Sequence, residues 1–187
     1  MNVESSTIGE LIRNHDLVRI ERAQIDTRTL QAFPLASSDT LLAVLYVYDF
    51  HIDGLLFLRR DTITDISVNA TAKFQRQLLK DAGCISDGLF CMPHKIDSFA
   101  SLLAGLSPNE ITILEEETLD NSGFWIGRYA WREDQTHWMH EFTGAGDWKD
   151  KMTQIDLDVV TCCQLDTNYI RFYQRHFNSR GFPRLPR

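Results

Sequence analysis

The sequence predicts an α+β protein, mainly β, that consists of two small SH3-like or Sm-like barrels joined by helices. Residues 40–68 are dominated by β-branched and aromatic side chains, and their turn signals fall at 49–54 and at 59–62, so they indicate three successive strands. The order of elements expected in the second half copies the order in the first half. We therefore expect a barrel with flanking helices in residues 1–92, and a linker helix, a second barrel and a C-terminal helix in residues 93–187.

The first half begins with a short expected helix, for which Thr7 and Glu10 form a capping box. Its expected strands span residues 17–23, 29–36 and, as three strands, 40–68. Five short strands joined by tight turns are typical of an SH3-like or Sm-like barrel. Asn69 is a suitable N-cap for a helix over 70–82, and Gly83 is a suitable stop.

The second half follows a connecting helix, which the apolar spacing predicts over residues 96–106. Its expected strands span residues 110–117, 124–131 and 137–142, with one or two more within 149–164, and a helix over 167–177 follows them. In both halves the helix after the strands carries a Gln-Arg pair, at 75–76 and at 174–175. This favours a duplicated module, and chance similarity of a common strand-then-helix order is the alternative.

Composition and charge narrow the class of protein. Of the 187 residues 43% are hydrophobic and 24% are charged, which is typical of a globular chain. The net charge of −7 argues against nucleic acid as a general partner, because phosphate backbones are bound mainly through Lys and Arg. Residues 171–187 hold five Arg and no acid, whereas residues 1–170 hold the other 14 basic side chains and all 26 acidic ones, a net charge of −12.

The sequence predicts a cytoplasmic protein without a membrane span. No apolar run reaches the roughly 18 residues that a span needs, and the N-terminus lacks a basic segment followed by an apolar one. The four cysteines show no CxxC pairing, so we expect reduced thiols, mostly buried. Cys162 and Cys163 are expected to point to opposite faces of a strand.

One segment carries a family resemblance. Asp53 to Ile66, DGLLFLRRDTITDI, followed by a helix, resembles the fourth- and fifth-strand region of a group of small uncharacterised bacterial proteins thought to have Sm-like or SH3-like barrels. WIGRY from Trp125 and YIRFYQRHF from Tyr169 are similar to their second half. The resemblance implies a tandem barrel fold and no known activity. Sm proteins bind RNA through an Asn in a first motif and an Arg-Gly in a second, and the corresponding place here holds Asp53-Gly54.

An aromatic hairpin is the first candidate binding surface. All four tryptophans lie between Trp125 and Trp148. Trp125, Tyr129 and Trp131 share one face of a strand, and across the hairpin we expect Trp138, His140 and Phe142 to join them. Such a surface could stack a base, a sugar or a partner's apolar side chain. The alternative is that it forms the second barrel's core or the contact between barrels.

No motif indicates catalysis, a metal or a cofactor. His137 and His140 in a strand send their rings to opposite faces, and the sequence lacks the helical zinc motifs. His51 and Asp53 could form a histidine–carboxylate pair, but turns favour such residues for backbone reasons alone. No nucleophile elbow and no dinucleotide loop are present in the sequence. We therefore expect a protein that is not an enzyme.

The basic tail is the second candidate binding surface. Arg171, Arg175 and Arg180 accompany Phe and Pro residues, a composition that can dock on an acidic or aromatic groove. The alternative is that they are the usual cations of a helix C-terminus. The acidic residues 115–117 and Asp120 could receive this tail, within the chain or from a second copy.

These observations predict a non-catalytic binding or scaffold protein, which acts on an unidentified protein partner or through self-association. The first alternative is an RNA-binding regulator, for which the basic tail and the aromatic hairpin have to lie on one surface. The second alternative is an acidic, immunity-type inhibitor of a basic enzyme, which would use the acidic body for electrostatic steering.

Overall fold

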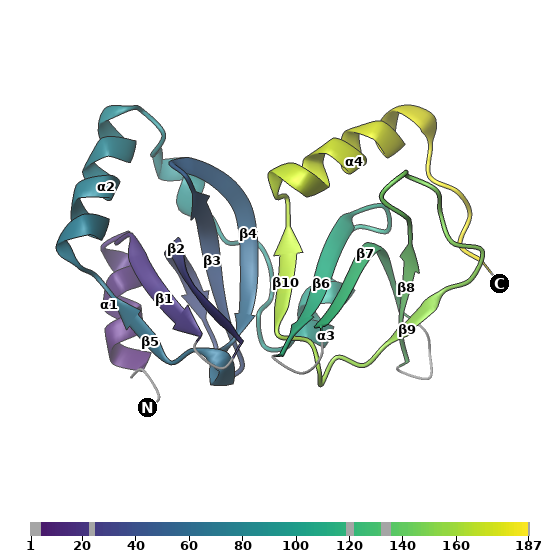
Figure 1. The fold of residues 1–187 in the computed structure, drawn as a ribbon, viewed down its shortest axis with the longest axis horizontal. Coiled ribbons are helices and arrows are strands. Elements are labelled where there is room, and N and C mark those ends of the chain that lie inside the picture. The colour runs from purple at the N-terminus through teal and green to yellow at the C-terminus, as the bar shows by residue number, and fades with distance from the viewer. Residues whose placement is uncertain (1–4, 23–24, 119–121, 132–135, 187) are drawn as a thin grey trace.

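The fold is a single open antiparallel sheet with helices packed around it (Figure 1). The computed structural model describes residues 5–22, 25–118, 122–131 and 136–186, and their side chains except those at 5, 6, 26–28, 87 and 131. Its ten strands follow the order β5-β1-β2-β3-β4-β10-β6-β7-β8-β9.

The elements have the following bounds. The helices are α1 (Ser5–Arg13), α2 (Ala70–Asp81), α3 (Phe99–Ala104) and α4 (Asn168–Arg180), with 3-10 turns η1 (Arg60–Thr62) and η2 (Asp87–Phe90). The strands are β1 (Val18–Arg22), β2 (Asp26–Ser37), β3 (Leu41–Tyr48), β4 (His51–Arg59), β5 (Asp65–Ser67), β6 (Ile111–Glu117), β7 (Ser122–Trp131), β8 (His137–Glu141), β9 (Thr153–Ile155) and β10 (Cys162–Leu165).

The predicted pair of SH3-like or Sm-like barrels joined by helices is wrong, and so is the predicted tandem repeat of such barrels. Strand β10 pairs with β4 through Cys162 and Leu58, and with β6 through Cys162 and Glu115. The strand edges that would close each half on itself are therefore used to join the halves into one open sheet. The division at residues 92 and 93 stays a prediction.

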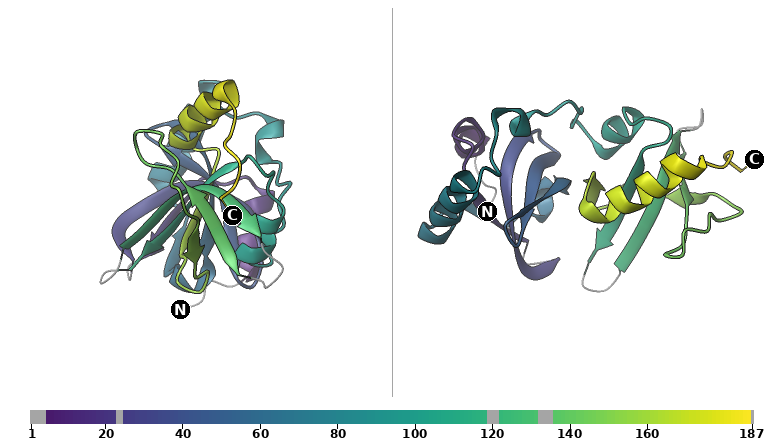
Figure 2. Two further views of the ribbon diagram at one scale, coloured as in Figure 1. Left: turned by 90° about the vertical axis from the view of Figure 1, so that its right-hand side faces the viewer. Right: turned by 90° about the horizontal axis from the view of Figure 1, so that it is seen from above.

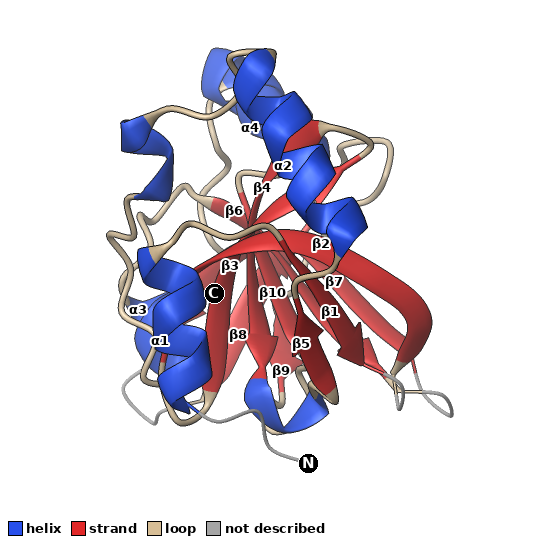
Figure 3. Cartoon of the chain, turned by 90° about the vertical axis from the view of Figure 1, so that its left-hand side faces the viewer, coloured by secondary structure: helices blue, strands red, loops and turns tan. Residues whose placement is uncertain are grey.

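Alternation along the central strands defines two faces of the sheet. Cys163 and Leu114 point to the side covered by α3, which we call the α3 face. Cys162 and Ile113 point to the opposite side, the α4 face, where α4 packs on the second half. Seen from above, the yellow helix α4 runs across the strands of the second half (Figure 2). Figure 3 shows the twisted sheet from its β5 end, with α1 and α2 at that end.

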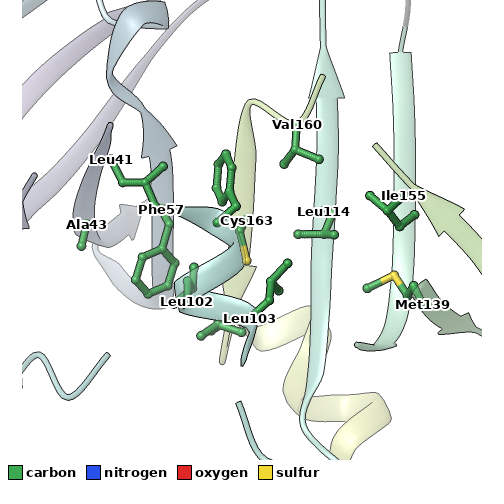
Figure 4. Packing of buried hydrophobic residues seen from close by; sticks show 12 residues of the cluster. Leu41, Ala43, Phe57, Leu102, Leu103, Leu114, Met139, Ile155, Val160 and Cys163 are labelled. Carbon is green, nitrogen blue, oxygen red and sulfur yellow. The ribbon is translucent and has the colours of Figure 1, made fainter. Parts of the chain in front are cut away.

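The main hydrophobic core contains residues from both halves. Leu41 and Phe57 of the first half and Leu114 of the second half belong to one buried cluster on the α3 face. Leu102 and Leu103 of α3 lie between them (Figure 4). Because this cluster spans the joint at β10, both halves contribute side chains to the same apolar contacts.

Capping residues explain where the helices begin. The Asn69 side chain accepts a hydrogen bond from the Ala72 amide at 2.8 Å, as predicted for the start of α2. Thr167 caps α4 through the Ile170 amide. The capping box predicted at Thr7 is wrong, because α1 begins two residues earlier and Thr7 lies inside it.

Within the described residues, no helix is both long enough and apolar enough to cross a membrane. The four cysteines, all of them described, are unpaired thiols. Cys162 and Cys163 are buried on opposite faces, as predicted, whereas Cys84 and Cys91 are exposed.

Candidate functional site

A cavity of about 530 Å³ opens on the α4 face where the two halves of the sheet meet. We call it the central groove. Its floor is formed by β4, β10 and β6, and its walls by β1, β2, β3 and the start of α4. The residues that matter for its chemistry are Arg22, Tyr46, Tyr48, Asp49, Asp53, Glu115, Glu117, Cys162, Gln164 and Tyr169. A volume of this size is typical of sites for a small ligand or a single side chain.

A buried ion pair crosses the groove. Arg22 of β1 donates to both carboxylate oxygens of Glu117 of β6, with Nη1–Oε2 and Nη2–Oε1 distances of 2.6 and 2.7 Å. Strands β2, β3, β4 and β10 separate β1 from β6 in the sheet, so the sheet has to curl to bring the two side chains together. Arg22 is only 4% exposed. Burial opposes its charge, but the hydrogen bonds and charge of Glu117 outweigh burial and raise the pKa of Arg22.

Polar groups beside the ion pair are also held in place. The Gln164 amide donates to Glu115 Oε2 at 2.6 Å, and Thr161 Oγ1 donates to Glu117 Oε2 at 2.9 Å. Burial raises the pKa of Glu115. Burial also raises the pKa of the Cys162 thiol well above its usual value, so this thiol stays protonated at neutral pH.

The same cluster is a poor metal site. Glu115, Glu117 and Cys162 place one ligand atom each within 4.8 Å of one another. Both oxygens of Glu117 are engaged by Arg22, whose positive charge would repel a cation. The protonated Cys162 is not a thiolate ligand. This geometry suits hydrogen bonding more than metal coordination.

Tyrosines and a tight turn form the mouth of the groove. Tyr48 is 64% exposed and Tyr169 is 51% exposed. Both rings therefore present a large aromatic surface to solvent. Asp49 and Phe50, at the tip of the β3–β4 hairpin, have φ angles of 46° and 61°. Two successive left-handed residues are typical of a type I′ hairpin turn.

The hairpin is fixed to the start of α4. Asp53 Oδ1 accepts from the Asn168 amide at 2.5 Å, which places a carboxylate at the helix N-terminus. Gly54 has a φ of +77°, and a Cβ there would lie 2.5 Å from backbone atoms of Asp166 and Thr167. These contacts hold Tyr48 and Tyr169 on opposite walls of one groove. The suggested pair of His51 and Asp53 does not form, because His51 Nδ1 contacts the Asp49 carbonyl instead.

The predicted aromatic surface is divided between the two faces. Trp125 and Tyr129 lie on the α3 face and pack against the main core. Ala130 pairs with Trp138, and Arg128 pairs with His140, so Trp138, His140 and Phe142 lie on the α4 face. The prediction that Trp138, His140 and Phe142 share a face with Trp125 is wrong, because the observed pairing of β7 with β8 is shifted by one residue from the expected pairing. The Trp131 side chain lies outside the described residues.

The histidines behave as predicted for a strand. His137 pairs with Ile155 on the α3 face, whereas His140 pairs with Arg128 on the α4 face, so the two rings cannot share a metal. The Tyr129 hydroxyl contacts His137 Nδ1 at 2.7 Å. Burial lowers the pKa of His137.

The predicted arginines of the tail lie on α4. Arg171 pairs with Asp166 at 2.8 Å, the Arg175 guanidinium lies 4.6 Å from the centre of the Phe172 ring, and Arg180 is exposed at the helix end. They are on the opposite side of the sheet from Trp125 and Tyr129. Trp138 lies on the same face of the sheet as α4, so the RNA-binding alternative, which needs the tail and the aromatic hairpin on one surface, stays a prediction.

The last described residues pack on the second half. Arg128 is 4% exposed and donates to the Pro183 carbonyl at 2.8 Å and to Asn109 Oδ1 at 2.9 Å. Its guanidinium also lies 4.8 and 5.1 Å from the ring centres of Trp148 and Phe182.

The tail therefore contacts Arg128 and the surrounding aromatic rings, whereas the acidic residue Glu117 is occupied by Arg22. Asp120, the other acidic residue suggested as a receiver of the tail, lies outside the described residues.

Comparison with family models, with curated proteins and with solved structures finds no match.

The residues of the central groove were not predicted as a site, although the sequence contains a signal for them. Arg22 alternates with Val18 and Ile20 and so occupies an inward position of its strand. Glu115 and Glu117 likewise continue the alternation of Ile111 and Ile113. Charged residues at inward positions are normally paired, and this rule could have suggested a buried ion pair.

Proposed function

We propose that this protein is a cytoplasmic, non-catalytic binding protein and that the central groove is its binding site. The proposal rests on the lining of the groove. Its floor consists of polar side chains that already hydrogen-bond to one another, and exposed aromatic side chains form its walls. Both oxygens of Glu117 are engaged by Arg22, and Cys162 is protonated, so neither is prepared to act as a base or nucleophile. Unpaired thiols agree with a reducing compartment.

A protein is the proposed partner because large aromatic side chains are exposed around the groove. Tyr48 and Phe50 on the β3–β4 hairpin are 64% and 44% exposed, and Tyr169 and Phe172 on α4 are 51% and 62% exposed. Aromatic side chains of this kind supply much of the binding energy in protein interfaces. The contact between Asp53 and Asn168 holds these two elements together, so the surface is preformed.

Site-specific photo-crosslinking in the protein's own host tests this proposal. A photoreactive amino acid at Tyr48 or at Tyr169 should give one discrete protein product. The matched control is Phe74 on α2, which is also 64% exposed but lies outside the groove. Equal product patterns from Tyr48 and Phe74, or no product from either groove position, would contradict a binding site here.

The acidic inhibitor remains a second candidate because the groove lining contains four carboxylates, Asp49, Asp53, Glu115 and Glu117, and one arginine, Arg22. Such a surface favours a basic partner through electrostatic steering. If the crosslinked partner is an enzyme, addition of this protein should abolish its activity, and full activity of the saturated complex would exclude an inhibitor.

A further inference from the structure

The central groove holds carboxylates that form no ion pair with a basic residue of the described part of the chain. Arg22 is committed to Glu117 through two hydrogen bonds, and Asp53 accepts from the N-terminus of α4. Of the four carboxylates that line the groove, this leaves Glu115 in the floor and Asp49 at the mouth. Within the described part of the chain, neither has a Lys or Arg at ion-pair distance. The groove therefore favours a positively charged ligand.

A second observation indicates that the ligand also carries a hydrogen-bond acceptor. Among the described residues the Nε–H of Arg22 has no hydrogen-bond partner, although the side chain is only 4% exposed and lines the groove. A buried donor without an acceptor destabilises the folded protein, because it has lost its hydrogen bonds to water. A carbonyl oxygen brought by a ligand would satisfy it.

The walls and the size of the groove favour an organic cation over a metal ion. Rings of Tyr46, Tyr48 and Tyr169 line it, and aromatic faces attract ammonium and guanidinium groups. The cavity of about 530 Å³ is large enough for a long side chain. A bare metal ion would need the oxygens of Glu117 that Arg22 occupies.

We propose that the central groove binds an arginine or lysine side chain presented by a basic segment of a partner protein. Glu115 is the counter-ion of that side chain, the tyrosines contact its cationic group, and the Nε–H of Arg22 donates to a carbonyl of the segment's backbone. This inference rests on the proposed function and adds the chemical class of the partner.

Titration of the full chain with short capped peptides, followed by NMR of its backbone amides, tests the inference. The probe is Ac-Gly-Ser-Gly-Arg-Gly-Ser-Gly-NH2, and in two control peptides citrulline or glutamate replaces the arginine. The arginine peptide should shift the amide signals of Glu115 and Gln164 in a saturable way. The citrulline peptide, which lacks the charge, should bind at least tenfold more weakly.

Two variants of the protein separate the groove from general charge attraction. Glu115→Gln keeps an acceptor for the Gln164 amide and should weaken binding of the arginine peptide at least tenfold. The matched control, Glu116→Gln, makes the same charge change on the same strand but on the α3 face, and should change the dissociation constant less than twofold. Equal weakening by both variants would overturn the assignment of Glu115. Unchanged thermal midpoints would show that both variants fold.

Free spermidine distinguishes a peptide from a small amine. It carries charge but no carbonyl for Arg22, so it should bind at least tenfold more weakly than the arginine peptide, and equal or tighter binding would overturn the peptide assignment. Binding of the glutamate peptide in the groove would overturn the cation inference and leave the proposed function intact. Failure of the proposed function is seen separately, as absence of crosslinked product at Tyr48 and Tyr169.

Discussion

At the scale of single residues, the buried ion pair between Arg22 and Glu117 should contribute strongly to stability. Removing one partner of a buried pair leaves the other charge without compensation, which costs roughly 3–5 kcal/mol. We therefore expect Glu117→Ala to lower the free energy of unfolding by about 3 kcal/mol in urea denaturation, because Arg22 is almost fully buried. Glu116→Ala, on the same strand, should change it by less than about 0.5 kcal/mol.

The double variant Arg22→Met with Glu117→Leu separates two effects of Glu117→Ala: the lost attraction between the two charges, and the cost of leaving the Arg22 charge buried without a partner. An apolar pair of similar volume often replaces a buried ion pair without loss. We expect the double variant to regain most of the stability that Glu117→Ala loses. A double variant as unstable as the single one would show that packing around the pair, not charge burial, determines the effect.

His140 makes the stability depend on pH. Its Nε2 contacts the Lys149 carbonyl at 3.0 Å and its Nδ1 accepts from Arg128 at 3.1 Å, so the ring is neutral. Burial, together with the charge of Arg128, lowers the pKa of His140. The unfolded chain therefore takes up this proton at a higher pH than the folded chain, and the free energy of unfolding should decrease as the pH falls below about 6.5.

The variant His140→Gln tests this dependence, because glutamine keeps a donor and an acceptor without titrating. Urea denaturation at several pH values between about 7.5 and 5.5 should show a smaller decrease in the variant than in the unmodified protein. The comparison removes the shared contribution of His137, whose pKa burial also lowers. Profiles that superimpose would contradict the assignment.

At the scale of elements, Gly54 fixes the β3–β4 hairpin against α4. An alanine there would need a positive φ and would place its Cβ 2.5 Å from the Asp166 carbonyl. We expect Gly54→Ala to destabilise the protein by at least about 2 kcal/mol, measured by thermal or urea denaturation. Gly144→Ala is the matched control, because its Cβ would meet no atom within 4 Å, and a similar loss in both variants would contradict a local clash.

Local patterns in the sequence predict most elements but not their neighbours. Asn69 and Thr167 cap helices because their side chains can accept from free amides, which is a local property. The place of β10 between β4 and β6 could not be predicted, because alternation says which way a side chain points and not which strand lies beside it.

The same limit explains the errors at the candidate sites. The predicted face of Trp138 is wrong because the β7–β8 pairing differs by one residue from the expected one, and a shift of one residue reverses the face. The inward positions of Arg22 and Glu117 were predictable, but their pairing depends on a curl of the whole sheet.

At the scale of the whole molecule, the shared core predicts cooperative unfolding. Leu41 and Phe57 of the first half belong to the same cluster as Leu114 and Met139 of the second. All four tryptophans lie in the second half, so their fluorescence reports on that half, whereas far-ultraviolet circular dichroism reports on both. We expect the two urea transitions to coincide. Separate midpoints would show that residues 1–92 and 93–187 unfold as independent domains.

The position of β10 also determines the order in which the sheet can be completed. This strand of four residues is the last to be made, yet it occupies the middle of the sheet. Until it is in place, β4 and β6 each have an open hydrogen-bonding edge. A second copy's β10 offers the same pairing, so we expect refolding at high concentration to give dimers that exchange β10 and α4, and refolding at low concentration to give monomers only.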